Sequence, residues 1–251
     1  MFSRSAGQAA HPVPLAPFQE EGDSELSGVL EATGVTLNYG ETSAVSDASL
    51  RISSGQIVAI TGPSGSGKSS LLYCLAGVLR PSQGTVCFEG ENLCSLNDAD
   101  LSLLRREQFG FVFQYGELLP ELTIEENTAL PLRLAGVSKR PARHAAAEVL
   151  DRLGLAKLRY RRPPQVSGGQ AQRVAVARAL VHQPAVVFAD EPTGSLDSAS
   201  AAAVLQEFLG LARSQGSAVV LVTHDAQVAA QADRRCTMSD GRLTVQRAED
   251  T

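Results

Sequence analysis

The sequence has no apolar run long enough to cross a bilayer. A membrane-spanning helix needs about 20 consecutive apolar residues, whereas the best candidates, residues 185–189 and 218–222, have only the length of a strand. Residues 1–10 contain one basic residue, Arg4, with no apolar segment after it, so we expect no secretory signal. The sequence therefore predicts a chain that does not span the membrane and stays in the cytoplasm.

The sequence also lacks cysteines at the spacing of metal ligands, and it lacks an excess of positive charge. The cysteines at 74, 87, 94 and 236 form no Cys-x-x-Cys or Cys/His pattern, so we expect reduced thiols. The 22 basic residues are outnumbered by 27 acidic ones, which gives a net charge of −5 and argues against a globally basic nucleic-acid binder. A short basic stretch at residues 157–162 is typical of a solvated loop.

The order of the apolar runs predicts an α/β fold. With 251 residues and 43% hydrophobic residues, the chain can bury a sizeable core. Prolines and acidic residues at 1–28 predict a disordered tail, and 29–251 read as one domain. Alternating apolar residues after 29 predict antiparallel strands, and the continuous run 57–60 predicts a buried parallel strand. A helix is expected at 69–79, and a helical insertion at about 95–182 that contains one strand, 109–114.

A complete P-loop follows the predicted strand at 57–60. It reads Gly62-Pro63-Ser64-Gly65-Ser66-Gly67-Lys68-Ser69, followed by Ser70, and matches the Walker A pattern at every required position. The glycines let backbone N–H groups point at phosphate oxygens, and the helix that follows adds its positive end. Lys68 would neutralise the outer phosphates of a nucleotide, and the Ser69 hydroxyl suits Mg²⁺.

Polar side chains follow three further apolar strands. Asp190 and Glu191 end the run at 186–189, Gln114 ends the run at 111–113, and His224 follows the run at 219–222. The carboxyl ends of parallel strands meet at one edge of a sheet, where phosphates bind. We therefore expect Asp190 to hold Mg²⁺ through water, Glu191 to deprotonate the attacking water, and Gln114 and His224 to contact the reacting groups.

A second predicted anion site lies about a hundred residues after the P-loop. Ser167, Gly168, Gly169 and Gln170 open an apolar helix, whose first N–H groups and dipole favour a negative charge. One chain thus carries two half-sites for one nucleotide.

Taken in order, these motifs resemble the ATPase subunit of ABC transporters over about residues 29–245. The resemblance implies a RecA-like core sheet, an N-terminal antiparallel subdomain and an inserted helical subdomain. It implies that Tyr39 stacks on adenine, that Ser167–Gln170 is the signature and that Asp197 belongs to the D-loop at 195–197. It also implies ATP and Mg²⁺ as cofactors, a head-to-tail dimer with ATP at its interface, and a membrane permease that keeps the chain at the inner face of the membrane.

The subgroup that serves macrolide export, lipoprotein release and cell division is the one that the sequence resembles most. The residues that carry this likeness are Phe111-Val112-Phe113-Gln114, Leu118-Leu119-Pro120 and Leu130-Pro131-Leu132. Two positions depart from the usual pattern: Val166 stands where leucine is usual, and Ala171 where the subgroup often has glutamine. Leu118, Leu119 and a helix that starts after Thr123 are expected to form much of the permease-docking surface.

Other functions stay open at this point. A soluble ABC ATPase in a non-transport complex, such as iron–sulfur cluster assembly, would carry the same motifs, as would a cell-division regulator. A nucleic-acid-associated ATPase is disfavoured because the chain has neither long coiled-coil or zinc insertions nor a second ATPase domain. A regulator that binds ATP without turnover is disfavoured by the presence of Glu191 and His224.

Overall fold

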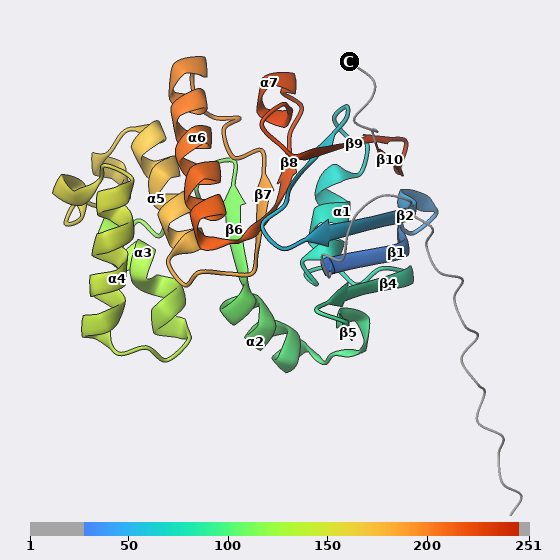
Figure 1. Ribbon diagram of the computed structural model, residues 1–251, viewed down its shortest axis with the longest axis horizontal. Coiled ribbons are helices and arrows are strands. Elements are labelled where there is room, and N and C mark those ends of the chain that lie inside the picture. Colours follow the sequence, from blue (N-terminus) through green and yellow to red (C-terminus); the bar gives the residue numbers. More distant parts are fainter. Residues whose placement is uncertain (1–27, 246–251) are drawn as a thin grey trace, which may run out of the picture.

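The computed structural model describes residues 28–245, which form two sheets and a surrounding set of helices (Figure 1). The predicted disordered tail, residues 1–28, lies outside the described residues except for Gly28, which begins the first strand.

The first sheet is antiparallel, as predicted, and is built mostly from the N-terminal part of the chain. Its strand order is β2-β1-β4-β5. The strands are β1 (Gly28–Tyr39), β2 (Thr42–Ser53), β4 (Gln83–Phe88) and β5 (Glu91–Asn92). β1 and β2 form a hairpin in which Tyr39 faces Thr42. The hairpin therefore ends beside Tyr39, the residue expected to stack on adenine.

The second sheet is the core of the domain and has the order β10-β9-β3-β8-β7-β6. Its strands are β3 (Ile57–Thr61), β6 (Phe109–Phe113), β7 (Val186–Asp190), β8 (Ala218–Val222), β9 (Arg234–Ser239) and β10 (Arg242–Val245). All neighbouring pairs are parallel except β10 with β9. β3 and β8 are buried on both faces, which explains their continuous apolar runs. The predicted α/β core is confirmed.

Seven α-helices surround this sheet in the described residues. They are α1 (Lys68–Leu75), α2 (Asp98–Gln108), α3 (Ile124–Leu134), α4 (Lys139–Arg152), α5 (Gly168–Leu180), α6 (Ser198–Gln215) and α7 (Ala226–Ala229). Figure 1 shows α3, α4 and α5 grouped at one side, with α6 next to them. The predicted helical insertion at about 95–182 includes β6, which is the edge strand of the core sheet, so the helical group begins only at α3.

Helix α1 is shorter than the predicted helix at 69–79. The apolar spacing continues to Leu79, but Gly77 has a φ of 61°, and the helix ends at Leu75. A left-handed glycine just after the last turn is a common way to end a helix. Periodicity alone did not reveal this stop.

Two apolar cores lie on opposite faces of the core sheet. Val58 and Ile60 of β3 belong to the core shared with α1 and the antiparallel sheet, whereas Ile57 belongs to the core shared with α5 and α6. The two cores fix β3 between layers, and the loop after Thr61 starts from a rigid strand.

Candidate functional site

The predicted site residues follow strands that lie side by side. In the strand register, Phe113 pairs with Asp190, Asp190 with Val222, and Ile60 with Val222. Gln114 and Glu191 follow Phe113 and Asp190 directly, and His224 and the P-loop begin two positions after Val222 and Ile60. The structure therefore brings them together at one edge of the core sheet, where the sequence placed them.

The P-loop glycines are required by close backbone contacts. Gly62 and Gly67 have φ values of 144° and 99°. A Cβ atom on Gly62 would lie 2.0 Å from the Met238 carbonyl oxygen, and one on Gly67 would lie 2.0 Å from the Ala44 carbonyl oxygen. No side chain fits such a gap. The loop is held between β2 and β9, and the β1–β2 hairpin with Tyr39, which is 55% exposed, lies on this side of the loop.

Lys68 folds back over its own loop. Its Nζ donates to the carbonyl oxygens of Gly62 at 2.9 Å and Pro63 at 2.8 Å, and the residue is buried. The ammonium group thus lies beside the backbone N–H groups of the loop. Both kinds of donor could bind the same phosphate there.

Asp190 is held by two hydroxyl groups of α1. Ser69 Oγ donates to Asp190 Oδ1 at 3.1 Å, and the Tyr73 hydroxyl donates to Asp190 Oδ2 at 3.2 Å. Burial first, and then the Asp190 carboxylate, raises the pKa of Tyr73, so the phenol stays protonated and donates. Sequence reasoning missed Tyr73, although its spacing of four residues from Ser69 places both on one helix face.

If Asp190 helps to hold Mg²⁺, as the sequence predicts, Tyr73→Phe should lower turnover and raise the Mg²⁺ concentration needed for half-maximal turnover, because Asp190 loses one of its two donors. A hydrogen bond to a charged group contributes about 1.5–3 kcal/mol, so each effect should be about ten- to a hundredfold. Titration of nucleotide turnover with Mg²⁺ measures both. Tyr160→Phe, at an exposed tyrosine far along the chain, is the control. Identical Mg²⁺ curves for Tyr73→Phe and the unchanged chain would contradict this role.

Glu191 and His224 form a close pair. His224 Nδ1 lies 2.7 Å from Glu191 Oε1, and the Glu191 side chain is 19% exposed. Glu191 has a φ of 48°, and its N–H donates to the Val222 carbonyl oxygen at 3.0 Å, which fixes this unusual backbone at the strand end. A carboxylate held in this way is positioned to take a proton from water.

Gln114 lies between β6 and the D-loop. Ser195 Oγ donates to the Gln114 carbonyl oxygen at 2.7 Å. A Cβ atom on Gly194 would lie 2.9 Å from Gln114 Nε2, so a larger residue at 194 would push the Gln114 amide aside. The glycine thus allows the amide to rest against the turn that follows Glu191.

The signature opens α5 with a capping box. Ser167 Oγ accepts from the Gln170 N–H at 3.3 Å, and Gln170 Oε1 accepts from the Ser167 N–H at 3.0 Å. The N–H groups at the start of a helix have no partner within it, so Gly168 and Gly169 present free donors. Both glycines lie near the D-loop and the first turn of α6, which Asp197 caps through the Ser200 N–H at 3.0 Å. The P-loop, by contrast, packs against Ala44 and Met238.

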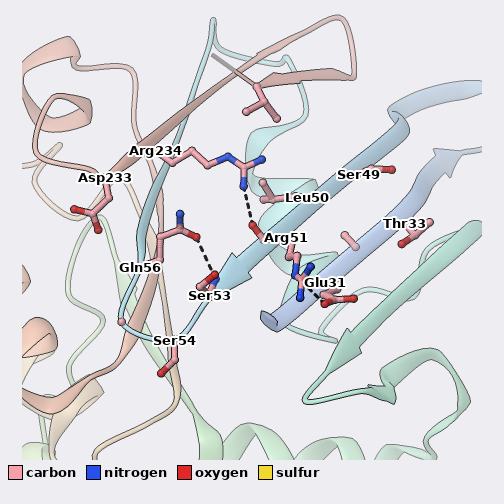
Figure 2. Close-up of a pocket in the computed structure, with 13 residues that line it drawn as sticks. Glu31, Thr33, Ser49, Leu50, Arg51, Ser53, Ser54, Gln56, Asp233 and Arg234 are labelled. Atoms are coloured by element: carbon pink, nitrogen blue, oxygen red, sulfur yellow. Dashed lines mark hydrogen bonds and ion pairs between the residues drawn. The ribbon is translucent and has the colours of Figure 1, made fainter. Parts of the chain in front are cut away.

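A cavity of about 550 Å³ lies at the opposite end of β3 (Figure 2). Its polar groups are already engaged: Arg51 pairs with Glu31 at 3.2 Å, Arg234 donates to the Arg51 carbonyl oxygen at 3.0 Å, and Gln56 Oε1 accepts from the Ser53 N–H at 3.1 Å. The loop at 54–56 precedes β3, whereas the P-loop follows it. This cavity is not the nucleotide site.

Two further observations concern the described part of the chain. None of its helices is long and apolar enough to span a membrane. Between residues 28 and 245, no three His, Cys, Asp or Glu side chains are clustered so as to hold a metal ion by themselves.

A model of the ABC transporter family matches residues 45–194, more than half of the chain. The chain therefore belongs to the ABC transporter family, and it is an ATPase subunit that binds and hydrolyses ATP.

Comparison with similar proteins indicates which subgroup of the family this chain resembles. The lipoprotein-releasing system ATP-binding protein LolD of Hyphomonas neptunium is 40% identical over 222 residues, which cover 87% of this chain and 97% of that protein. The macrolide export ATP-binding/permease protein MacB of Photorhabdus laumondii is 44% identical over 222 residues, which cover 87% of this chain and 34% of that protein. The dimeric ATP-binding cassette MJ0796, solved with ADP and Pi, has a TM-score of 0.79 at 36% identity and covers 88% of this chain and 100% of that one. The predicted likeness to the lipoprotein-release and macrolide-export subgroup is confirmed.

Proposed function

We propose that two copies of this chain bind two ATP molecules between them and drive a separate membrane permease. The observation that carries this proposal is the presence of two anion-binding elements, the P-loop and the signature, that pack against different parts of one chain. If the P-loop of one copy and the signature of the other surround the same ATP molecule, each of the two half-sites has a partner. The dimeric form of MJ0796 supports this arrangement.

In the proposed reaction, Glu191 takes the proton of the attacking water. The water oxygen bonds to the γ-phosphorus atom, the bond from that phosphorus to the β,γ-bridging oxygen breaks, and ADP leaves with inorganic phosphate. Lys68 and the P-loop N–H groups stabilise charge on the phosphate oxygens. His224, which is paired with Glu191, donates to the γ-phosphate in this proposal. Tyr39 stacks on the adenine.

The donors at the site suit Mg²⁺. Ser69 Oγ and the Asp190 carboxylate lie within 3.1 Å of each other, and both are hard oxygen ligands. We propose that Ser69 and the Gln114 amide oxygen hold the ion, with Asp190 acting through water. Once bound, Mg²⁺ would neutralise phosphate charge. The lack of an all-protein metal cluster in the described residues fits an ion that is shared with nucleotide phosphates.

The permease is proposed to be part of a lipoprotein-release or export system. The relatives named above are a releasing-system subunit and an export protein, which favours transport over iron–sulfur assembly or another soluble complex. The candidate docking surface is the segment at 115–119 with α3. In it, Tyr115 is 75% exposed and Leu119 is 43% exposed. Bound there, the chain would lie at the inner face of the membrane.

Leu119→Asp tests this docking. We expect the substitution to abolish co-purification with the integral membrane partner from detergent-solubilised membranes, because it places a charge in an apolar contact, while ATP binding stays unchanged. Leu103→Asp on α2, at an equally exposed leucine, is the matched control and should retain the partner. Recovery of a soluble partner alone, or equal recovery with both variants, would contradict the proposal.

A further inference from the structure

The loop that carries Gln114 is fixed by side chains of the signature helix. Gln172 Nε2 donates to the Phe113 carbonyl oxygen at 2.8 Å. Arg178 donates through Nη2 to the Gly116 carbonyl oxygen and through Nη1 to the Glu117 carbonyl oxygen, both at 2.8 Å. Three hydrogen bonds from α5 thus hold three carbonyl groups of the Gln114 loop, residues 113–117.

The backbone of this loop needs such support. Gly116 and Glu117 both have positive φ values, 68° and 45°, and the second is not a glycine. Glycine adopts this conformation freely, whereas Glu117 persists in it only where its surroundings determine it. Arg178 holds the carbonyl groups of both, and a Cβ atom on Gly116 would lie 3.2 Å from Gln172 Oε1, so the loop runs close against α5.

Both side chains are shielded from solvent at this contact with the loop. Gln172 is 2% exposed, and burial lowers the pKa of Arg178, which reflects the removal of its guanidinium from water. A half-buried guanidinium that donates to two carbonyl groups makes strong, directional bonds. Neither side chain belongs to the set that we assign to nucleotide contact.

We infer that Gln172 and Arg178 are positioning residues that fix the Gln114 loop to the signature helix, so that Gln114 and the signature move as one unit. The signature forms the first turn of α5, and the two side chains stand on later turns of the same helix. A change in the position of Gln114 at one nucleotide would therefore shift the signature that faces the other nucleotide. The inference rests on the proposed role of Gln114 and adds a physical link between the two half-sites of one chain.

The first test is a double-substitution cycle on turnover. Arg178→Met should lower kcat by at least about ten- to a hundredfold, the range that corresponds to the loss of a single hydrogen bond to a charged group, while ATP affinity is kept. In a Gln114→Ala background the same substitution should cost less than about twofold, because its effect passes through Gln114. Arg178→Lys, which keeps the charge and one donor direction, should give an intermediate kcat. Equal losses in both backgrounds, or an unchanged kcat, would overturn the inference.

Gln172→Glu gives an independent variant if Arg178→Met does not fold. The carboxylate has the same shape but cannot donate to the Phe113 carbonyl oxygen, so the same dependence on Gln114 is expected. Arg140→Met, at an exposed arginine of α4, is the control and should turn over ATP normally. Absence of ATP turnover in the unchanged chain would count against the proposed function rather than against the positioning, whereas a loss of turnover in Arg140→Met equal to that in Arg178→Met would count against the positioning.

A second measurement does not depend on turnover. The chain contains no tryptophan, so Tyr115→Trp places a single fluorescent reporter on the Gln114 loop. We expect the fluorescence anisotropy of this reporter to fall when Arg178→Met or Gln172→Glu is added, because the loop is released from α5, and to stay unchanged with Arg140→Met. The same anisotropy in all four chains would overturn the inference, whether or not the chain hydrolyses ATP.

Discussion

Glu191→Gln is expected to lower kcat for ATP hydrolysis by about a hundred- to ten-thousandfold, the usual contribution of a general base. The amide keeps the size of the carboxylate and can still hydrogen-bond to His224 Nδ1, which lies 2.7 Å from the Glu191 oxygen. ATP affinity should stay within about twofold, because the lost interaction acts only in the transition state. Steady-state kinetics together with calorimetric ATP titration separate the two quantities.

The control for this substitution is Glu91→Gln, at an exposed carboxylate of β5 in the antiparallel sheet. It removes the same charge and should leave both quantities unchanged. If Glu191→Gln kept more than a tenth of the original kcat, the proton would have another acceptor and the assignment of Glu191 would fail.

Lys68→Ala is expected to weaken ATP binding about ten- to a hundredfold, because hydrogen bonds to a charged group contribute about 1.5–3 kcal/mol. The Lys68 ammonium group lies against the carbonyl oxygens of Gly62 and Pro63, at the loop that would surround the phosphates. The titration is best made in the Glu191→Gln background, where ATP is not consumed.

Loss of loop structure is the main alternative cause of weaker binding by Lys68→Ala. Its thermal unfolding should therefore be compared with that of Lys157→Ala, at an exposed lysine of the 3₁₀ turn Ala156–Leu158. Undiminished ATP affinity in a folded Lys68→Ala chain would show that the assigned P-loop is not the nucleotide site.

The sequence alone predicted the strand ends and the caps of this site. A continuous apolar run that stops at a polar residue marks where a buried parallel strand leaves the sheet, and this located Gln114, Asp190 and His224. The capping box of Ser167 and Gln170 is a local motif, so it too was readable without the fold.

Contacts between elements far apart in the chain could not be predicted in the same way. Tyr73 reaches Asp190 across 117 positions, and Arg178 reaches Gly116 across 62. Tyrosine and arginine on an apolar helix read as ordinary polar positions until the packing of α1 and α5 is known. For a related reason the sequence could not show that the strand at 109–114, within the predicted insertion at about 95–182, pairs with β7 as an edge strand of the core sheet.

The central claim is that ATP holds two copies together through the P-loop of one and the signature of the other. Light scattering of Glu191→Gln after gel filtration tests it most directly. With ATP and Mg²⁺ we predict twice the 26.4 kDa mass of the chain, and the mass of one chain without nucleotide or when Ser167→Arg is added. A single-chain mass at saturating ATP, or a dimer that forms equally well without nucleotide or with Ser167→Arg, would contradict the account.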